Sequence, residues 1–107
     1  MKLEIITTED FKRDFKHLFK KYRSLIDDIE QLKEELLENP QQGFPLCKDC
    51  YKVRMAISSK NQGKSGGARV ITHIKIVNEK IYLIAIYDKS DMENISDSEL
   101  KDRLGTI

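Results

Sequence analysis

The segment from Tyr51 to Lys89 constrains the fold most, because it contains three stretches with the pattern of β-strands. These stretches are Tyr51–Ile57, Ala68–Val77 and Ile81–Tyr87, and residues 58–67 form a lysine- and glycine-rich loop between the first two. Successive strand side chains point to opposite faces, so alternation separates apolar from charged positions. One face thereby collects five basic side chains and none of the carboxylates: Lys52, Arg54, Arg69, His73 and Lys75. This pattern favours an anionic ligand on that face.

The first forty residues predict one strand followed by two helices. Residues 1–6 have a strand pattern, with Leu3 and Ile5 on one face. A capping box at residues 7–10 predicts a helix start, and a second capping signature begins at Ser24. Asn39-Pro40 ends the second helix, because a residue before proline is disfavoured in the helical region. The helices' apolar faces are Phe11, Phe15, Leu18 and Tyr22, then Leu25, Ile29, Leu32 and Leu36.

The order of elements predicts an α+β fold of one domain, residues 1–107. We expect a helical hairpin on one face of a mostly antiparallel four-stranded sheet, with the cationic face left open. Asn78-Glu79 is typical of a tight hairpin connection. A third capping box, at residues 96–99, predicts a short C-terminal helix carrying Leu100 and Leu104.

Charge is distributed unevenly along the chain. Residues 48–80 carry a net charge of +6, whereas residues 1–47 and 81–107 carry −2 and −3. A basic middle in a nearly neutral protein favours a local polyanion site. No apolar run approaches the roughly 20 residues of a membrane span, and residues 1–6 are typical of a strand rather than a signal peptide. We therefore expect a cytoplasmic protein.

Cys47 and Cys50 form a Cys-x-x-Cys motif, which occurs in zinc sites and redox pairs. Zinc would need two more ligands, and only His17 and His73 are available, neither in a ligand-spaced motif. The pair also precedes a strand instead of opening a helix. The favoured interpretation is two reduced loop cysteines, with no metal or cofactor. Gly63-Lys64-Ser65 is not a P-loop, because Ser58 stands where the first glycine is required.

The chain resembles the RelE/ParE superfamily of bacterial toxins, within it the HigB-like RelE group. The residues that carry the resemblance are Phe19-Lys20-Lys21-Tyr22, Asn39-Pro40 with Gly43, Tyr51–Met55, Gly63–Ile71 and Ile81–Leu83, together with a Tyr-Asp-Lys strand end at 87–89. RelE-type members are interferases that cut mRNA in the ribosomal A site, and ParE-type members poison gyrase. The resemblance thus implies an mRNA endoribonuclease with a cognate antitoxin, in the HigB-like group often a helix-turn-helix protein.

The resemblance also implies roles for individual residues. Arg69 matches a catalytic arginine that holds the scissile phosphate, and Lys89 matches the basic residue that ends the last strand. Basic positions of the preceding strand and loop match Lys52, Arg54, Lys60 and Lys64. We expect Arg69, Lys89, Arg54 and Lys64 to be catalytic, and Lys52, Lys60, His73, Lys75 and Tyr87 to bind RNA.

RNA cleavage without metal requires a deprotonated 2′-hydroxyl, a stabilised pentacovalent phosphate and a protonated 5′-oxygen. Arginine and lysine supply the second requirement. Several RelE-type toxins have a tyrosine soon after the position of Lys89, whereas this chain has none in residues 90–95. Tyr87, Asp88 and Glu93 are the candidate substitutes for a general base. A ParE-like gyrase inhibitor, or a homologue that binds RNA without cutting it, remains the alternative.

Overall fold

The computed structural model describes residues 3–107, so Met1 and Lys2 of the expected first strand lie outside the described residues. The strands are β1 (Glu4–Thr7), β2 (Phe44–Pro45), β3 (Cys50–Met55), β4 (Ala68–Lys75) and β5 (Lys80–Asp88). The helices are α1 (Glu9–Phe19), α2 (Leu25–Glu38) and α3 (Asp97–Leu104), with short 3-10 turns η1 (Ser58–Lys60) and η2 (Ile76–Asn78). None of these helices is long and apolar enough to cross a membrane.

The five strands form one sheet in the order β1-β5-β4-β3-β2. β1 pairs with β5 in parallel, and the other neighbours are antiparallel. The α+β class is therefore confirmed, and the sheet gains a two-residue edge strand, β2, that the sequence pattern did not indicate. β5 lies between β1 and β4, which explains why it is apolar on both faces.

The helix starts follow local chemistry that is readable in the sequence. Thr8 accepts a hydrogen bond from the Phe11 amide and caps α1, and Ser96 accepts one from the Glu99 amide and caps α3. Ser24 precedes α2, but its hydroxyl donates to Asp28 instead of capping an amide. The capping prediction is therefore right in position for all three helices and wrong in mechanism for the second.

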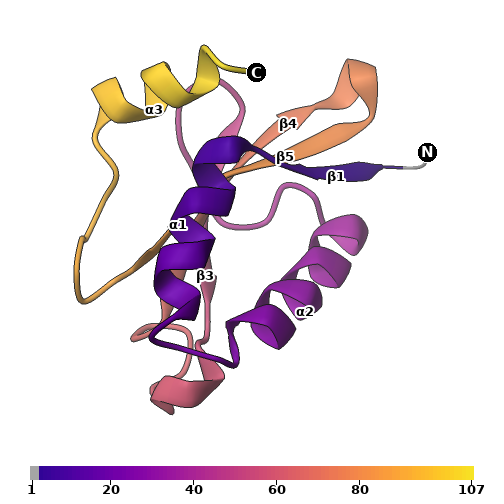
Figure 1. The fold of residues 1–107 in the computed structure, drawn as a ribbon. Helices are drawn as coiled ribbons and strands as arrows, with labels where there is room; N and C mark the ends of the chain where they lie inside the picture. The colour runs from indigo at the N-terminus through magenta and orange to yellow at the C-terminus, as the bar shows by residue number, and fades with distance from the viewer. Residues whose placement is uncertain (1–2) are drawn as a thin grey trace.

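The helical hairpin covers one face of the sheet, as predicted. Leu25, Ile29, Leu32 and Leu36 of α2 and Phe11 and Leu18 of α1 pack on Val53, Val70, Ile81 and Leu83 of the strands. In Figure 1, α1 lies in front of β3 with α2 beside it, and α3 lies above the end of α1, near the C-terminus.

The opposite face is not open along its whole length, which corrects the expectation from the sequence. Leu100 of α3 packs on a second buried cluster with Ile71, Ile84 and Ala85 of the sheet. Arg103 secures α3 by donating to the Asp14 carboxylate at 2.6 Å and to the Ile84 carbonyl at 3.1 Å. Basic side chains thus occupy only the part of this face that α3 leaves uncovered.

The turn between β4 and β5 also differs from the expected tight hairpin. β4 ends at Lys75, two residues before the predicted end, and η2 carries the chain to Glu79, whose φ is 56°. Ile76 and Val77 therefore leave the sheet, and Val77 is 95% exposed. A second irregularity lies within the pair, where the β4–β5 register shifts between Ile71 and Thr72.

Candidate nucleic-acid site

A groove of about 640 Å³ lies beside β3 and is lined by three cations, Lys52, Arg54 and Lys64. The remaining lining residues are Gln42, Gly43, Phe44 and Val53, so no lining residue is acidic. Lys52 and Arg54 come from β3, whereas Lys64 comes from the loop that connects β3 to β4. The structure therefore brings together three of the basic residues that the sequence assigned to the site.

Arg54 and Arg69 lie directly opposite each other in the β3–β4 register. Like charges at directly opposed positions destabilise a sheet. Neither arginine forms an ion pair with a carboxylate of residues 3–107. An uncompensated pair of cations costs folding free energy, and an anionic ligand would relieve that cost.

Arg69 is only 4% exposed, and its guanidinium holds the loop in place. Its Nη1 donates to the carbonyls of Lys64 and Ala68 at 3.1 Å each, and its Nη2 donates to Ser65 at 3.2 Å. The resemblance to RelE toxins implies that Arg69 holds the scissile phosphate. The side chain instead folds back under the Lys64–Ser65 backbone, so any phosphate contact uses the donors that remain.

Tyr87 is paired with Arg69 across β4 and β5, and its side chain is buried. Burial raises the pKa of Tyr87, although the nearby Ile95 backbone and Arg69 oppose the rise. No group of the described residues completes a hydrogen bond with its hydroxyl. A buried hydroxyl without a complete hydrogen bond is rare and calls for an explanation.

Lys89 lies at the end of the same strand, and its amide donates to the Gly67 carbonyl at 3.1 Å. Because Tyr87 faces Arg69 and side chains alternate, Lys89 belongs to the same sheet face. Its side chain is exposed. The register therefore places Lys89 next to the loop that leads into Arg69, as the predicted shared site requires.

Lys60 does not join this group. Its Nζ donates to the Asp88 carboxylate at 2.8 Å and to Ser90 at 3.2 Å, and its side chain is only 10% exposed. Asp88 also accepts from the Tyr22 hydroxyl at 2.8 Å, which places this network on the face covered by the helical hairpin. The prediction that Lys60 binds RNA is therefore not supported by its position, which is that of a structural ion pair.

Asp88 is also poorly suited to act as a general base. Burial alone would raise the pKa of Asp88, but hydrogen bonds from Lys60, Ser90 and Tyr22 outweigh burial and hold it well below the usual range. A weakly basic carboxylate with its acceptors already used does not abstract a proton efficiently. Of the other two candidate general bases, Tyr87 faces the cationic side of the sheet, and Glu93 lies on the exposed segment after β5.

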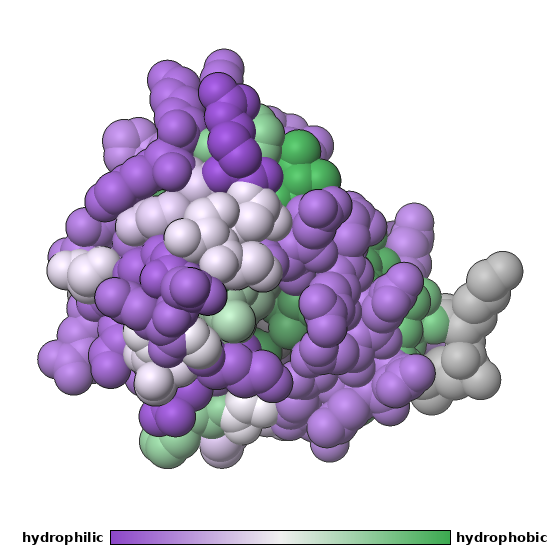
Figure 2. Space-filling model, turned by 90° about the horizontal axis from the view of Figure 1, so that it is seen from below, coloured by the Kyte–Doolittle hydropathy of each residue, from purple (hydrophilic) through white to green (hydrophobic). Residues whose placement is uncertain are grey.

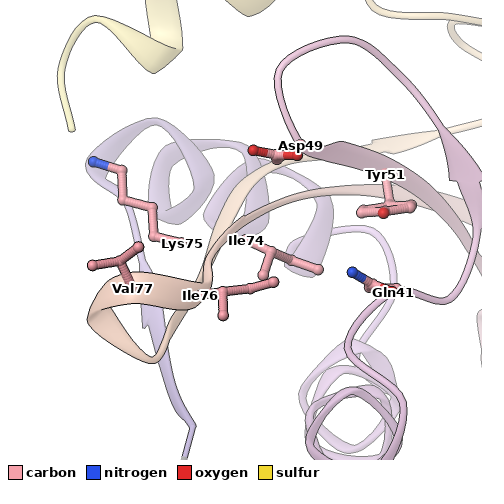
Figure 3. A pocket seen from close by; sticks show the side chains of 7 residues that line it. All are labelled: Gln41, Asp49, Tyr51, Ile74, Lys75, Ile76 and Val77. Atoms are coloured by element: carbon pink, nitrogen blue, oxygen red, sulfur yellow. The ribbon is translucent and has the colours of Figure 1, made fainter.

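His73 and Lys75 lie at the opposite end of β4, about 13–20 Å along the strand from Arg69 at the usual rise per residue. The His73 Nδ1 lies 3.5 Å from the Cys50 sulfur, and burial lowers the pKa of His73. Lys75 lines a separate pocket with Ile74, Ile76 and Val77, as Figure 3 shows. These two residues share the predicted strand face with Arg69 but do not line the groove.

Cys50 is fully buried, whereas Cys47 is exposed, and the two are not bonded to each other. Burial raises the pKa of the Cys50 thiol to about 11, which makes it a poor nucleophile. Both thiols are free, as expected, but only Cys47 lies in the loop, because Cys50 is the first residue of β3.

Two residues near the groove were missed in the sequence. Phe44 is 65% exposed in β2, and Lys52 Nζ lies 5.7 Å from the centre of its ring. Asn94, on the segment after β5, accepts a hydrogen bond of 2.6 Å from the same Nζ. Neither stands in a recognisable motif, because both reach the groove through long-range packing.

The end of the molecule that carries the 58–67 loop in Figure 1 has a largely hydrophilic surface in Figure 2.

Comparison with known proteins identifies the family. A family model described as the RelE toxin of the RelE/RelB toxin-antitoxin system matches residues 3–104. The chain is also similar to the structure of the isolated E. coli RelE toxin, with a TM-score of 0.59, 14% identity and 100% of both chains covered. A double-arginine mutant of E. coli RelE in the free state matches with a TM-score of 0.57 and 20% identity, over 87% of this chain and 90% of that chain. Since the family model spans almost the whole length and the fold agrees, this chain belongs to the RelE toxin family.

Proposed function

We propose that this protein is the toxin of a type II toxin–antitoxin module and cuts mRNA in the ribosomal A site, in the cytoplasm. The observation that carries the proposal is the cross-strand pair of Arg54 and Arg69 beside an acid-free groove. Membership of the RelE family supports the toxin role, and the excess of unpaired cations supports RNA as the target. The family name also implies a RelB-type antitoxin partner, which in the HigB-like group is often a helix-turn-helix protein.

The proposed chemistry is transphosphorylation without a metal ion. The 2′-oxygen attacks the adjacent phosphorus, the bond to the 5′-oxygen breaks, and the 2′-proton leaves to a base while the 5′-oxygen gains a proton. Arg54, Lys64 and Lys89 stabilise the charge that develops on the phosphate, with the remaining donors of Arg69. Such preorganised charge stabilisation is often the largest contribution to catalysis. Lys52 binds the RNA backbone, and Tyr87 is the favoured proton-transfer group because it alone of the candidate bases faces Arg69.

Expression of the protein in growing bacteria tests this function. We expect growth arrest and new 5′ ends within codons of translated mRNAs, and we expect gyrase supercoiling in the same extracts to stay normal. An Arg54→Ala variant, expressed to the same level, is the matched control and is expected to cut far less. Arrest with intact mRNA and inhibited gyrase would place the protein in the ParE class. Ribosome binding without new 5′ ends would indicate an RNA-binding homologue.

Lys89 provides a second test within the same site. We expect Lys89→Ala to slow single-turnover cleavage on programmed ribosomes at least about tenfold, equivalent to about 1.4 kcal/mol of transition-state stabilisation. The melting temperature is expected to stay unchanged, because the Lys89 side chain is exposed and only its amide bonds to the sheet. Unchanged cleavage would return Lys89 to an ordinary surface lysine.

A further inference from the structure

Phe44 is an exposed aromatic side chain held in a cationic groove, and it takes no part in either buried cluster of the described residues. At 65% exposure, its ring gains little from burial in the folded protein. Most of the other exposed large hydrophobic residues are aliphatic and lie outside this groove. Packing therefore does not explain why an aromatic ring stands at this position.

The backbone fixes the position of the ring. Phe44 pairs with Lys52 in the β2–β3 register, so both side chains lie on the same face of the sheet. The preceding Gly43 has a φ of 103°, and a Cβ there would lie 2.7 Å from the Lys52 carbonyl oxygen. The following Pro45 occupies the outer edge of the sheet, where a missing amide donor is tolerated. Local geometry thus presents the ring at the groove instead of leaving it on a free loop.

The cations around the ring are arranged for a phosphate backbone. Lys52 Nζ lies 5.7 Å from the ring centre and is held by the Asn94 side chain, while Arg54 and Lys64 line the same groove. Proteins that bind single-stranded nucleic acid combine such a positive groove with aromatic rings on which bases stack. The volume of about 640 Å³ lies within the range of ligand-binding sites, about 300–1,000 Å³.

We propose that Phe44 is a stacking platform for one base of the RNA whose phosphates contact Lys52, Arg54 and Lys64. The inference rests on the proposed function, because it takes the mRNA strand as the occupant of the groove. Phenylalanine offers a π-face and no hydrogen-bonding group, so the platform selects by stacking strength. It therefore favours a purine over a pyrimidine without reading base edges.

A tryptophan reporter tests the contact without requiring cleavage. The chain contains no tryptophan, so a Phe44→Trp variant has a single indole in the groove. It is titrated with ribosomes programmed with an mRNA whose A-site codon carries 2′-O-methyl groups, which prevents attack by the 2′-oxygen. The comparison uses the same ribosomes with an mRNA truncated after the P-site codon. We expect indole quenching with the full mRNA, stronger for a purine, and little quenching with the truncated one. A Val77→Trp variant, whose indole lies at the far end of β4, is expected to show no such difference.

Removal of the ring tests its contribution to RNA capture. We expect Phe44→Leu to raise the toxin concentration for half-maximal cleavage about tenfold or more, and Phe44→Tyr to restore the wild-type value. Circular dichroism should remain unchanged, because the side chain is exposed.

Equal quenching with full and truncated mRNA, or wild-type cleavage by Phe44→Leu, would overturn the proposal while leaving the nuclease function intact. Loss of antitoxin binding by Phe44→Leu with unchanged RNA cleavage would overturn it as well, and would assign the ring to a protein contact. If the Phe44→Trp indole were quenched more by the full mRNA than by the truncated one, but the wild-type protein cut no mRNA, only the nuclease function would be refuted.

Discussion

Arg54 and Arg69 occupy directly opposed positions on β3 and β4, yet only the first is exposed. The buried guanidinium supports the 64–65 backbone, and the exposed one faces the groove. One arginine is thus committed to shaping the loop while the other stays available to a ligand. Substitutions at the two positions are therefore expected to affect stability differently.

Arg54→Ala is expected to separate activity from stability. It removes a like-charge repulsion of the kind worth up to about 1 kcal/mol between opposed strand residues, so the free energy of unfolding should stay equal or rise slightly. Ribosomal cleavage should fall at least about tenfold. Urea denaturation and single-turnover cleavage check both expectations. Lys16→Ala on the exposed side of α1 is the matched control. A clear loss of stability in Arg54→Ala would contradict the view that repulsion between Arg54 and Arg69 destabilises the fold.

Arg69→Ala is expected to lose both activity and stability. It removes the guanidinium donors from the carbonyls of Lys64, Ser65 and Ala68, so the free energy of unfolding should fall by about 1–3 kcal/mol. Hydrogen exchange of the 58–67 amides, measured with denaturation, reports the loop directly. Unchanged exchange protection would show that the carbonyl bonds do not organise the loop.

Tyr87→Phe removes a buried hydroxyl that completes no hydrogen bond with residues 3–107, although the Ile95 backbone lies close to it. We expect the unfolding free energy to stay equal or rise by about 1 kcal/mol, since an unsatisfied buried polar group is lost. Single-turnover cleavage should nevertheless fall about tenfold or more if Tyr87, which is paired with Arg69 across β4 and β5, transfers the proton as we propose. Full activity in the variant would remove Tyr87 from the list of candidate bases.

Asp88→Asn should destabilise the protein in a pH-dependent manner. Because the folded-state pKa of Asp88 lies below its unfolded value of about 3.9, the ionised carboxylate stabilises the fold above that pH. That stability is lost as pH falls below about 4 towards the folded pKa. At pH 7 the variant should lose about 3 kcal/mol, because the buried Lys60 side chain is left without its partner. Denaturation at pH 7, 4 and 3 should show the gap from wild type narrowing with acidity, and a constant gap would contradict this account.

Gly67→Ala should destabilise the start of β4. An added Cβ would clash with the Met55 carbonyl oxygen, so the β3 and β4 backbones must separate. Overpacking of this kind costs about 1–3 kcal/mol. Gly105→Ala is the matched control, because its Cβ would meet no atom closer than 3.4 Å and the backbone there is helical. Equal thermal denaturation of the two variants would show that the strands yield at little cost.

The sequence by itself determined the class of fold and the family. Hydrophobic periodicity marked α1, α2 and the three long strands, because burial of an apolar face imposes a repeat that is visible residue by residue. Alternation also grouped Lys52 with Arg54 on one strand face. The resemblance to RelE toxins rested on local motifs, and the family match over residues 3–104 agrees with it.

Only the tertiary structure decided which of these residues share one site. The register shift between Ile71 and Thr72 leaves Ile84 unpaired on β5, and this extra residue reverses the faces of the residues that follow. Tyr87 therefore faces the cationic side with Arg69, whereas Asp88 turns to Tyr22 and Lys60. Strict alternation from Ile81 would have placed Tyr87 under the helices. Three features depend on contacts between distant segments: the bulge at Ile84, the carbonyls that bind the Arg69 guanidinium, and the position of Phe44 opposite Lys52. A local sequence pattern does not record such contacts.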